Sequence, residues 1–549
     1  MSDMKEYVVT LRNRSDIDAF YDDMESVGGD LHIPNRRVDI AQLREISRNT
    51  HYYLTDEEAV QLRNDPRVLA VELLPSALGV VPVPHWTQSG NFEKSATIDT
   101  NDKNWGLYRI ASGTALSNWG TNGSFTQTTQ TVNTTSSGKY VDVVVVDAHI
   151  NPNHPEFAVN TNGTGGSRVN QYDWFTHSAY LGYSTVGTYS YASVSSNHGT
   201  HVAGTVAGNT QGWARDANIY SMEFNYAGGN GPAGDWTLYI FDYIRAFHLN
   251  KPINPITGRR NPTVVNNSWG YSYGNFSLGS ISSVTYRGVT TAVTGTDPQR
   301  KTILEARGVP VPAGTYLYRP PYRYTPLEAD IQDAIDDGVI IVASAGNSYW
   351  NCVDALSQDY NNSIIFSGST VFHSRGSSPG ADSSAICVGS IGTTIQEYKS
   401  DFSNYGSRVD IWAPGSNIVS AVYDTSAASE FGITLANDPR DSNYKLGSIS
   451  GTSMSGPQVT GVLACLAENQ PRLTQSEARS YLTTYGKWGQ VGSTGGGAGD
   501  YTSLGDGSNN RHLFYRLERA LSGNVAINTY KIRSSTGAAY PRTRIRRFG

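Results

Sequence analysis

Short, almost wholly apolar runs recur along the middle of the chain. The run from Val141 to Val146 is nearly all β-branched and apolar, which is typical of a parallel strand covered on both faces. Comparable runs follow in ANIYSMEF, PTVVNNSWG, GVIIVASAGN and SAICVGSI. Helix-like stretches separate several of them, notably residues 235–249 and 327–337. This alternation predicts an α/β fold with a mainly parallel central sheet, in a domain spanning residues 105–486.

The first part of the chain follows another pattern. The strand-like EYVVTLRN leads to a helical stretch from Asp16 to about Ser26, and HYYL, a second helix and VLAVEL follow. Thr55, followed by three acidic residues, suits the N-cap of that second helix. This order of elements predicts a small ferredoxin-like α+β domain over residues 1–78. Residues 79–104, rich in Pro, Ser, Thr and Asn, predict a linker.

Two segments stand outside the rhythm of the main domain. Residues 271–325 end in the Tyr-, Arg- and Pro-rich stretch TYLYRPPYRYTP, and we interpret them as an insertion. Beyond Gly486, residues 487–549 begin glycine-rich and finish on the basic tail KIRSSTGAAYPRTRIRRFG. We therefore interpret residues 487–549 as a segment separate from the main domain.

Composition and charge narrow the classes of function. A net charge of −6 over 549 residues is mild, so we expect neither nucleic acid nor a membrane as a partner. No stretch approaches the roughly 18 apolar residues that a membrane span requires. The N-terminal MSDMKEYVVTLRNRSD has no basic region followed by an apolar one. We therefore expect no Sec-type signal and a cytoplasmic or particle-associated protein.

Two polar residues follow apolar strands, at the edge where open α/β sheets build their sites. Asp147 comes directly after the run 141–146, and Asn347 closes the string SAGN after VIIVA. Taken alone, Asp147 would most often be a turn residue, and Asn347 would carry no information. A side-chain amide at the place of Asn347 can, however, donate a hydrogen bond to an oxyanion.

The string NHGTHVAG carries a candidate general base, His198, whose imidazole can take up a proton near neutral pH. His198 and His201 could instead form a metal pair. Their spacing lacks the glutamate of HExxH, and no Cys or carboxylate lies nearby at ligand spacing. We therefore predict no metal ligand here and interpret His201 as a buried, hydrogen-bonded helix residue.

A candidate nucleophile, Ser453, lies in GTSMSGP directly before the apolar helix QVTGVLACLAE. A serine at a helix N-terminus faces free N–H groups and the positive end of the helix dipole, which suits an attacked carbonyl. The alternative is an N-cap serine, which is common in any protein. The combination outweighs it, because Asp147, His198 and Ser453 follow one another in the order of a known catalytic triad, inside specific strings.

With these strings the sequence resembles the subtilase family of serine proteases. The resemblance runs, with interruptions, over residues 105–464 and includes HPEF, GWARDANIYSM and FSNYGSRVDIWAPG. It implies the subtilisin-like three-layer fold and a serine endopeptidase that acts on polypeptides. The implied triad is Asp147, His198 and Ser453, with Asn347 in the oxyanion hole. No cofactor is implied as required, and calcium, which is common in the family, is a possible ligand.

The resemblance also assigns the substrate cleft. The strand that lines the pocket for the residue before the scissile bond matches Ser268, Trp269 and Gly270. The opposite strand of the cleft falls near Tyr226, Ala227 and Gly228. An extended peptide is then implied to bind as an added strand between the two segments.

Residues 1–78 resemble the inhibitory propeptide of subtilases. This implies that the N-terminal domain is an intramolecular inhibitor of a zymogen until the chain is cut within about residues 75–104. No dibasic pair marks a cleavage point there, so we expect autoprocessing.

The sequence departs from the family at Ala148 and His149, where the family has Ser or Thr and then Gly. Ala148 lacks a hydroxyl that could hold the Asp147 carboxylate, and His149 brings a titratable ring close to the triad. Ser455, Gly456 and Gln458 also depart, but none removes a group that transfers a proton.

The alternative function is a structural or assembly protein on a subtilase scaffold, with only autoprocessing or no activity. Such a protein would dock on a large assembly, for example a phage particle, through the basic C-terminal tail.

Overall fold

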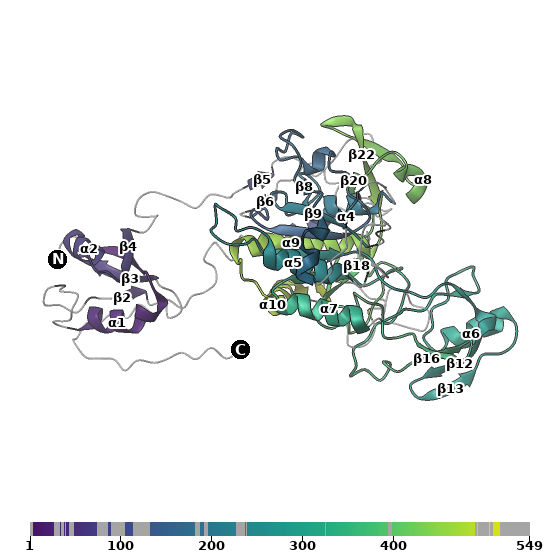
Figure 1. Ribbon diagram of the computed structural model, residues 1–549. Helices are drawn as coiled ribbons and strands as arrows, with labels where there is room; N and C mark the ends of the chain where they lie inside the picture. The colour runs from purple at the N-terminus through teal and green to yellow at the C-terminus, as the bar shows by residue number, and fades with distance from the viewer. Residues whose placement is uncertain are drawn as a thin grey trace. The chain divides into compact units, whose positions relative to one another are not determined.

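The computed structural model shows two compact units, one within residues 1–83 and one within residues 84–518 (Figure 1). The structure describes residues 4–26, 33, 38, 40–42, 49–73, 86–88, 105–113, 132–134, 136–181, 187–191, 196–224, 226, 237, 239–323, 325–392, 398–488, 491, 504 and 509–515. Ala227, Gly228, most of the linker 79–104 and most of residues 487–549 lie outside these ranges.

The first unit is a four-stranded antiparallel sheet with the strand order β2-β3-β1-β4. Its elements are β1 (Lys5–Leu11), η1 (Arg14–Asp16), α1 (Ile17–Glu25), β2 (Ile40–Gln42), β3 (Asn49–Leu54), α2 (Asp56–Arg63) and β4 (Val68–Leu73). Alternate residues of β1, namely Tyr7, Val9 and Leu11, are buried in one core with apolar residues of both helices. Thr55 forms a capping box with Glu58 at the start of α2, as its position in the sequence predicts.

The second unit is built on a nine-stranded sheet with the order β23-β24-β19-β18-β15-β10-β7-β9-β8. Its strands are β7 (Asp142–Asp147), β8 (Val169–Asn170), β9 (Asn218–Glu223), β10 (Thr263–Asn267), β15 (Ile340–Ser344), β18 (Ile386–Ile391), β19 (Ile411–Pro414), β23 (Lys487–Trp488) and β24 (Arg511–His512). All neighbouring strands are parallel except β23 and β24. The predicted mainly parallel sheet is therefore confirmed.

Helices cover both faces of this sheet and complete three layers (Figure 1). They are α3 (Trp105–Ser112), α4 (His198–Ala207), α5 (Ile240–Asn250), α7 (Thr325–Asp336), α9 (Thr452–Asn469) and α10 (Gln475–Tyr485). In β7, Val143 and Val145 pack in the core that contains residues of α4 and α9. Val144 and Val146 pack in the other core, with residues of α5 and α7. Covering on both faces explains why this strand is apolar without alternation.

Smaller elements lie around the layers. They are β5 (Trp86–Gln88), β6 (Val132–Thr134), η3 (Pro155–Phe157) and η4 (Trp174–Leu181). β5 and β6 pair with each other as antiparallel strands. Among the helices of the described ranges, none combines the length and the apolar character needed to cross a membrane.

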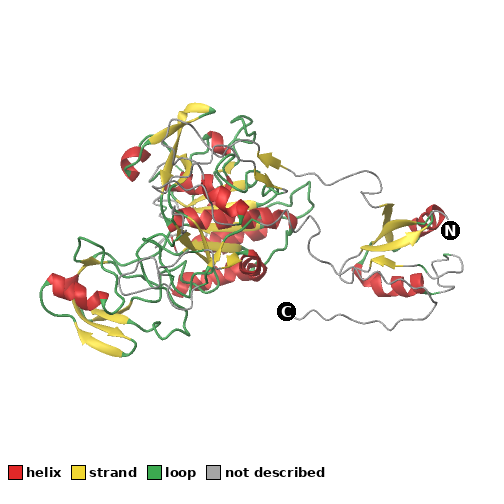
Figure 2. Cartoon of the chain, turned by 180° about the vertical axis from the view of Figure 1, so that it is seen from behind, coloured by secondary structure: helices red, strands yellow, loops and turns green. Residues whose placement is uncertain are grey.

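Residues 276–318 and 363–372 fold together into a lobe with a core of its own. Its elements are β11 (Phe276–Ser277), η6 (Leu278–Ser280), β12 (Ile281–Tyr286), β13 (Val289–Ala292), α6 (Asp297–Glu305), β14 (Leu317–Tyr318), β16 (Ser363–Phe366) and β17 (Ser369–Phe372). β12 pairs with both β13 and β16, so residues 271–325 share a sheet with a later part of the chain. Figures 1 and 2 show this lobe projecting from the layers.

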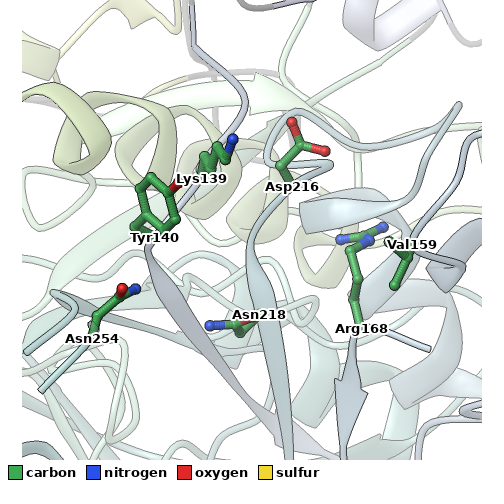
Figure 3. Close-up of a pocket in the computed structure, with 7 residues that line it drawn as sticks. All are labelled: Lys139, Tyr140, Val159, Arg168, Asp216, Asn218 and Asn254. Carbon is green, nitrogen blue, oxygen red and sulfur yellow. The ribbon is translucent and has the colours of Figure 1, made fainter. Parts of the chain in front are cut away.

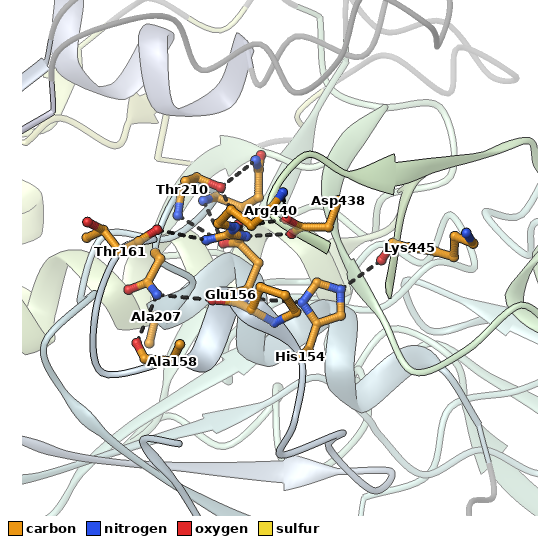
Figure 4. Close-up of polar contacts among 12 residues, drawn as sticks. His154, Glu156, Ala158, Thr161, Ala207, Thr210, Asp438, Arg440 and Lys445 are labelled. Atoms are coloured by element: carbon orange, nitrogen blue, oxygen red, sulfur yellow. Dashed lines mark hydrogen bonds and ion pairs between the residues drawn. The ribbon is translucent and has the colours of Figure 1, made fainter. Parts of the chain in front are cut away.

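Between β19 and α9 the chain forms a three-stranded sheet with the order β20-β22-β21, which we call the 418–449 hairpin. Its elements are β20 (Ile418–Val422), α8 (Ala427–Phe431), β21 (Leu435–Asp438) and β22 (Asp441–Ile449). The hairpin is anchored on η3 by Arg440, which pairs with the fully buried carboxylate of Glu156 (Figure 4). His154 Nε2 also donates a hydrogen bond to the carbonyl of Lys445 (2.9 Å). Breaking a buried ion pair is costly, so this end of the hairpin is held firmly.

Candidate active site

Three predicted residues lie at the carboxyl-terminal edge of the parallel strands, where such sheets build their sites. Asp147 is the last residue of β7, Ser268 follows β10, and Asn347 follows β15. β10 lies between β7 and β15 in the sheet. The strand order therefore gathers residues that are far apart in the sequence.

The Asp147 carboxylate is buried and held mainly through one of its oxygens. Its Oδ1 accepts hydrogen bonds from Nδ1 of His198 (2.7 Å) and from the backbone N–H of Ala148 (2.7 Å). Among the described residues, Oδ2 has no hydrogen-bond partner. Ala148 thus supplies a backbone donor to the carboxylate but no hydroxyl.

His198 is the first residue of α4, and its side chain is 26% exposed, so a substrate can reach the ring. Gly199 brings the helix close to β7, because a Cβ at this position would collide with the carbonyl oxygen of Ala148. Removal of the ring from water acts to lower the pKa of His198. The charge and hydrogen bond of Asp147 and the charge of Glu430 outweigh it and raise this pKa above its ordinary value.

Ser453 lies in the first turn of α9, and a pair of hydrogen bonds joins it to Ser268. Pro457 has no N–H, so the carbonyl of Ser453 lacks its usual partner within the helix. Ser268 Oγ donates to that carbonyl (3.1 Å), and Ser453 Oγ donates to the carbonyl of Ser268 (3.1 Å). Among the described residues, no hydrogen bond joins the hydroxyl of Ser453 to the ring of His198.

Asn347 is oriented by Thr452, the residue before the candidate nucleophile. Its Oδ1 accepts hydrogen bonds from the backbone N–H (2.9 Å) and the hydroxyl (2.7 Å) of Thr452. A backbone N–H can only donate, so the amide oxygen must lie on that side. Nδ2 therefore points elsewhere and lies 3.3 Å from the place that a Cβ on Gly451 would occupy. It remains available to donate beside Ser453.

A residue that the sequence did not single out, Asn404, holds the loop that carries Asn347. Its Nδ2 donates to the carbonyl of Ala345 (2.6 Å), and its Oδ1 accepts from the N–H groups of Ser348 and Trp350. The only sequence signal was its place in the family string FSNYG. Its role depends on contacts between segments that are far apart in the chain.

Aromatic rings surround the predicted substrate segments. Trp269 stacks on Phe224, with ring centroids 5.6 Å apart and planes 9° apart, and meets Tyr271 edge-on. Tyr226 is buried and stacks on Tyr189 at 4.3 Å, so its ring belongs to the core. Gly270 is exposed, whereas Ala227 and Gly228 lie outside the described residues.

His149 and Glu223 form a pair of titratable side chains near Asp147. Its Nδ1 lies 4.0 Å from Oε1 of Glu223, the residue of β9 that pairs with Asp147 in the sheet. The His149 ring also packs against Tyr191 and Tyr423. Burial raises the pKa of Glu223 to about 7. The departure at His149 therefore places an ionisable pair next to the candidate triad, with His149 after β7 and Glu223 on β9.

His201 is buried in α4, as predicted, and its Nε2 lies within hydrogen-bond distance of the carbonyls of Ile418 (3.0 Å) and Gly447 (3.1 Å). Desolvation lowers the pKa of His201 to about 3, so the ring is neutral. Within the part of the chain that the structure describes, no three His, Cys, Asp or Glu side chains gather as metal ligands. Calcium stays a prediction.

A separate open pocket of about 430 Å³ lies at the opposite edge of the sheet (Figure 3). Its lining consists of Lys139, Tyr140, Val159, Arg168, Asp216, Asn218 and Asn254. Asn218 begins β9, whereas the candidate triad uses the other end of the neighbouring β7. The Arg168 guanidinium donates to several backbone carbonyls. The pocket is thus distinct from the candidate active site.

Comparison with known proteins gives one family. The sequence profile of the subtilase family matches residues 138–509, which is more than half of the 549 residues. Alkaline serine exoprotease A of Vibrio alginolyticus is 26% identical over 445 residues, covering 81% of this chain and 56% of that protein. The extracellular serine proteinase of Thermus sp. (strain Rt41A) is 26% identical over 430 residues, covering 78% of this chain and 68% of that protein. The crystal structure of a cold adapted subtilisin-like serine proteinase matches with 24% identity and a TM-score of 0.42, covering 75% of this chain and 97% of that one.

Proposed function

The chain belongs to the subtilase family of serine peptidases, and we propose that it is an endopeptidase that hydrolyses peptide bonds through Asp147, His198 and Ser453. The observation that carries this proposal is the 2.7 Å hydrogen bond between Asp147 Oδ1 and His198 Nδ1. The bond leaves Nε2 of the ring to act as the base. A hydroxyl on the first turn of α9 is the group on which this base acts.

The reaction is an acyl transfer. Ser453 Oγ turns from the Ser268 carbonyl and attacks the peptide carbonyl, while His198 Nε2 takes its proton. The peptide C–N bond then breaks as His198 returns that proton to the leaving amine. Water then attacks the acyl-enzyme while His198 Nε2 takes a proton from it. The ester bond to Ser453 Oγ breaks, and His198 returns the proton to that oxygen. Asp147 keeps the proton of the neutral ring on Nδ1 and stabilises the imidazolium between these steps.

Two donors stabilise the oxyanion of each tetrahedral intermediate. They are Nδ2 of Asn347, which Thr452 orients, and the backbone N–H of Ser453 in the first turn of α9. N–H groups in a first turn have no partner within the helix, and the helix dipole favours negative charge there. These donors are in place before the reaction and need little reorganisation.

We place the substrate as an extended strand beside Ser268, Trp269 and Gly270, opposite the segment at Tyr226. The Ser268 carbonyl lies 3.1 Å from Ser453 Oγ, so a peptide beside this segment would reach the nucleophile. Backbone pairing of this kind gives affinity without a fixed sequence. The stacked rings of Trp269 and Phe224 favour a large apolar side chain nearby.

Replacing the nucleophile tests the proposal. Ser453→Ala should abolish both peptide hydrolysis and covalent labelling by a fluorophosphonate, because both need the same hydroxyl. Ser455→Ala is a matched control, since Ser455 lies in the same helical turn and donates instead to the carbonyl of Ala413. The control should still be labelled. Labelling that persists in Ser453→Ala would show that another residue is the nucleophile.

We further propose that the N-terminal unit is an intramolecular inhibitor of the peptidase unit. One face of its sheet is covered by α1 and α2, as the burial of alternate residues on β1 indicates. The other face carries residues such as Tyr53, which is 40% exposed. A sheet face of this kind can dock on a second surface.

A further inference from the structure

The 418–449 hairpin touches both sides of the proposed catalytic site. Its last strand, β22, ends at Ile449, and the chain runs from there into Ser453. Its earlier part, from Asp424 to Glu430, lies against the start of α4, where His198 is located. One stretch of chain therefore contacts the segment of the base and leads into that of the nucleophile.

The closest contact is made by Glu430 of α8. Its carboxylate accepts hydrogen bonds from the hydroxyl of Ser196, from the backbone N–H of Asn197 (3.0 Å) and from Asn197 Nδ2 (2.8 Å). Ser196 Oγ in turn accepts a hydrogen bond from the backbone N–H of His198 (3.1 Å). Glu430 thus holds the two residues that directly precede the proposed base.

Further hydrogen bonds fix the same turn. Asn197 Oδ1 accepts from the backbone N–H of Asp424 (2.9 Å), and Asn197 Nδ2 also donates to Ser426 Oγ (2.8 Å). Asn151, after β7, donates from Nδ2 to the carbonyl of Tyr423 (2.8 Å). Arg440 and Glu156 anchor the far end of the hairpin (Figure 4). α8 is therefore tied down on both sides of Glu430.

We propose that Glu430 is a positioning residue for His198: it fixes the turn at Ser196 and Asn197 and supplies a negative charge that acts on the ring. This inference rests on the proposed function and adds a second carboxylate to the site. Asp147 holds the ring directly through Nδ1, whereas Glu430 acts through the residues at the start of α4.

The charge has a consequence of its own. The titratable groups that interact electrostatically with His198 are Asp147 on β7, His201 on α4 and Glu430 on α8. His201 is neutral, so both charged neighbours are negative and both favour the imidazolium. Burial acts to raise the pKa of Glu430, but the hydrogen bonds from Ser196 and Asn197 and the charge of His198 lower it. Glu430 therefore stays ionised where His198 titrates.

The pH dependence of kcat/KM tests this role, because free His198 must be neutral to act as the base. In Glu430→Gln the pKa of His198 should fall, which moves the acid limb of the profile to lower pH. The alkaline plateau should fall about two- to fivefold, the size expected of an exposed ion pair, because the imidazolium of the transition state loses a partner. The two profiles should therefore approach or cross on the acid side.

Glu477→Gln is the matched control. Glu477 is also exposed, and it likewise accepts hydrogen bonds from a turn that begins a helix, through Thr474. This control loses the same charge away from His198 and should keep the wild-type profile. A Glu430→Gln profile whose acid limb coincides with the wild type would overturn the proposal, because a purely structural role lowers activity without moving that limb.

A readout that needs no activity separates this inference from the proposed function. In the full chain with Ser453→Ala, the imidazole Cε1–H signal of His198 is followed by NMR against pH and assigned by its loss in His198→Ala. Adding Glu430→Gln should move the titration to lower pH, and adding Glu477→Gln should not. An unmoved titration would refute the role of Glu430, whatever the wild type hydrolyses.

Discussion

Asn347 can offer only one end of its amide to a reacting molecule, because Thr452 binds the other end twice. Other residues of the candidate site are also held by hydrogen bonds to specific atoms. Asp147 uses Oδ1 for His198, and Ser268 uses both its hydroxyl and its carbonyl for Ser453. Asn347 and Asp147 are each oriented in part by a backbone N–H, which can only donate.

Loss of the Asn347 amide should therefore affect the transition state and not the binding of substrate. For Asn347→Ala we expect kcat to fall about 10²–10³-fold, a magnitude established for such a donor in subtilisin itself. KM should change little, because the amide is aimed at the oxyanion. Steady-state kinetics on a peptide substrate measures both constants.

Asn443→Ala, which removes an exposed amide from β22, is the control for this change and should keep wild-type kinetics. A fall in kcat/KM of Asn347→Ala that came entirely from KM would contradict the assignment, since it would mean that the amide binds substrate and transition state alike.

Among elements, α4 lies close to the end of β7, and this approach depends on Gly199. At Gly199 a Cβ would collide with the carbonyl oxygen of Ala148, in the segment directly after Asp147. In Gly199→Ala the helix must move away from β7 and carry His198 with it. A misplacement of about 1 Å can cost about 10²-fold in rate, so we expect at least that loss in kcat/KM.

A thermal melt followed by circular dichroism should show that Gly199→Ala still folds, with a lower midpoint. Gly274→Ala is the control, because a Cβ at Gly274 meets no atom within 4 Å. It should match the wild type in activity and in melting midpoint. A folded Gly199→Ala protein with unchanged kcat/KM would show that the close approach of α4 to β7 is dispensable.

The elements that the sequence predicts are those with a local signature. β7 and β15 are almost wholly apolar runs, and α9 begins within the serine-bearing string GTSMSGP, so Asp147, Asn347 and Ser453 could be assigned to the ends of these elements. Their catalytic roles stay predictions. Glu430 could not be found in this way, because it meets Asn197 through a fold that joins positions 233 residues apart.

Long-range pairing also explains why the strands of the lobe could not be predicted from the sequence. Residues 271–325 show no strand-and-helix rhythm, and their sheet is completed by β16, which is supplied by later residues. A short strand contains too few residues to show a clear alternation of apolar and polar positions. Its partner strand here also lies far along the chain. The stacking of Trp269 on Phe224 likewise depends on the ends of β10 and β9, which lie on either side of β7 in the sheet.

At the scale of the whole molecule, the chain has an α+β unit within residues 1–83 and a larger unit within residues 84–518, which contains most of the described part of the subtilase match. If the first unit is an inhibitor that the second removes, cleavage must depend on the nucleophile. We expect the purified wild-type chain to be cut within about residues 75–104 and the Ser453→Ala chain to stay intact. Intact-mass measurement of both proteins, prepared in parallel, checks this expectation.

The Ser455→Ala chain should be cut like the wild type, which controls for a change within α9. Cleavage of Ser453→Ala at the same bond would mean that another protease cuts the chain. An intact wild-type chain that already hydrolyses peptides would instead refute the inhibitory role.

The 418–449 hairpin also bears on how relatives of this protein could exchange parts. The hairpin is hydrogen-bonded to the turn before His198 and leads directly into Ser453. An insertion or deletion in the hairpin would therefore disturb one of these two connections. A recombinant enzyme that took β21 and β22 from one parent and the start of α4 from another would separate Glu430 from Asn197. In such a recombinant, residues 418–453 should therefore come from the same parent as Ser196 and Asn197, which Glu430 contacts.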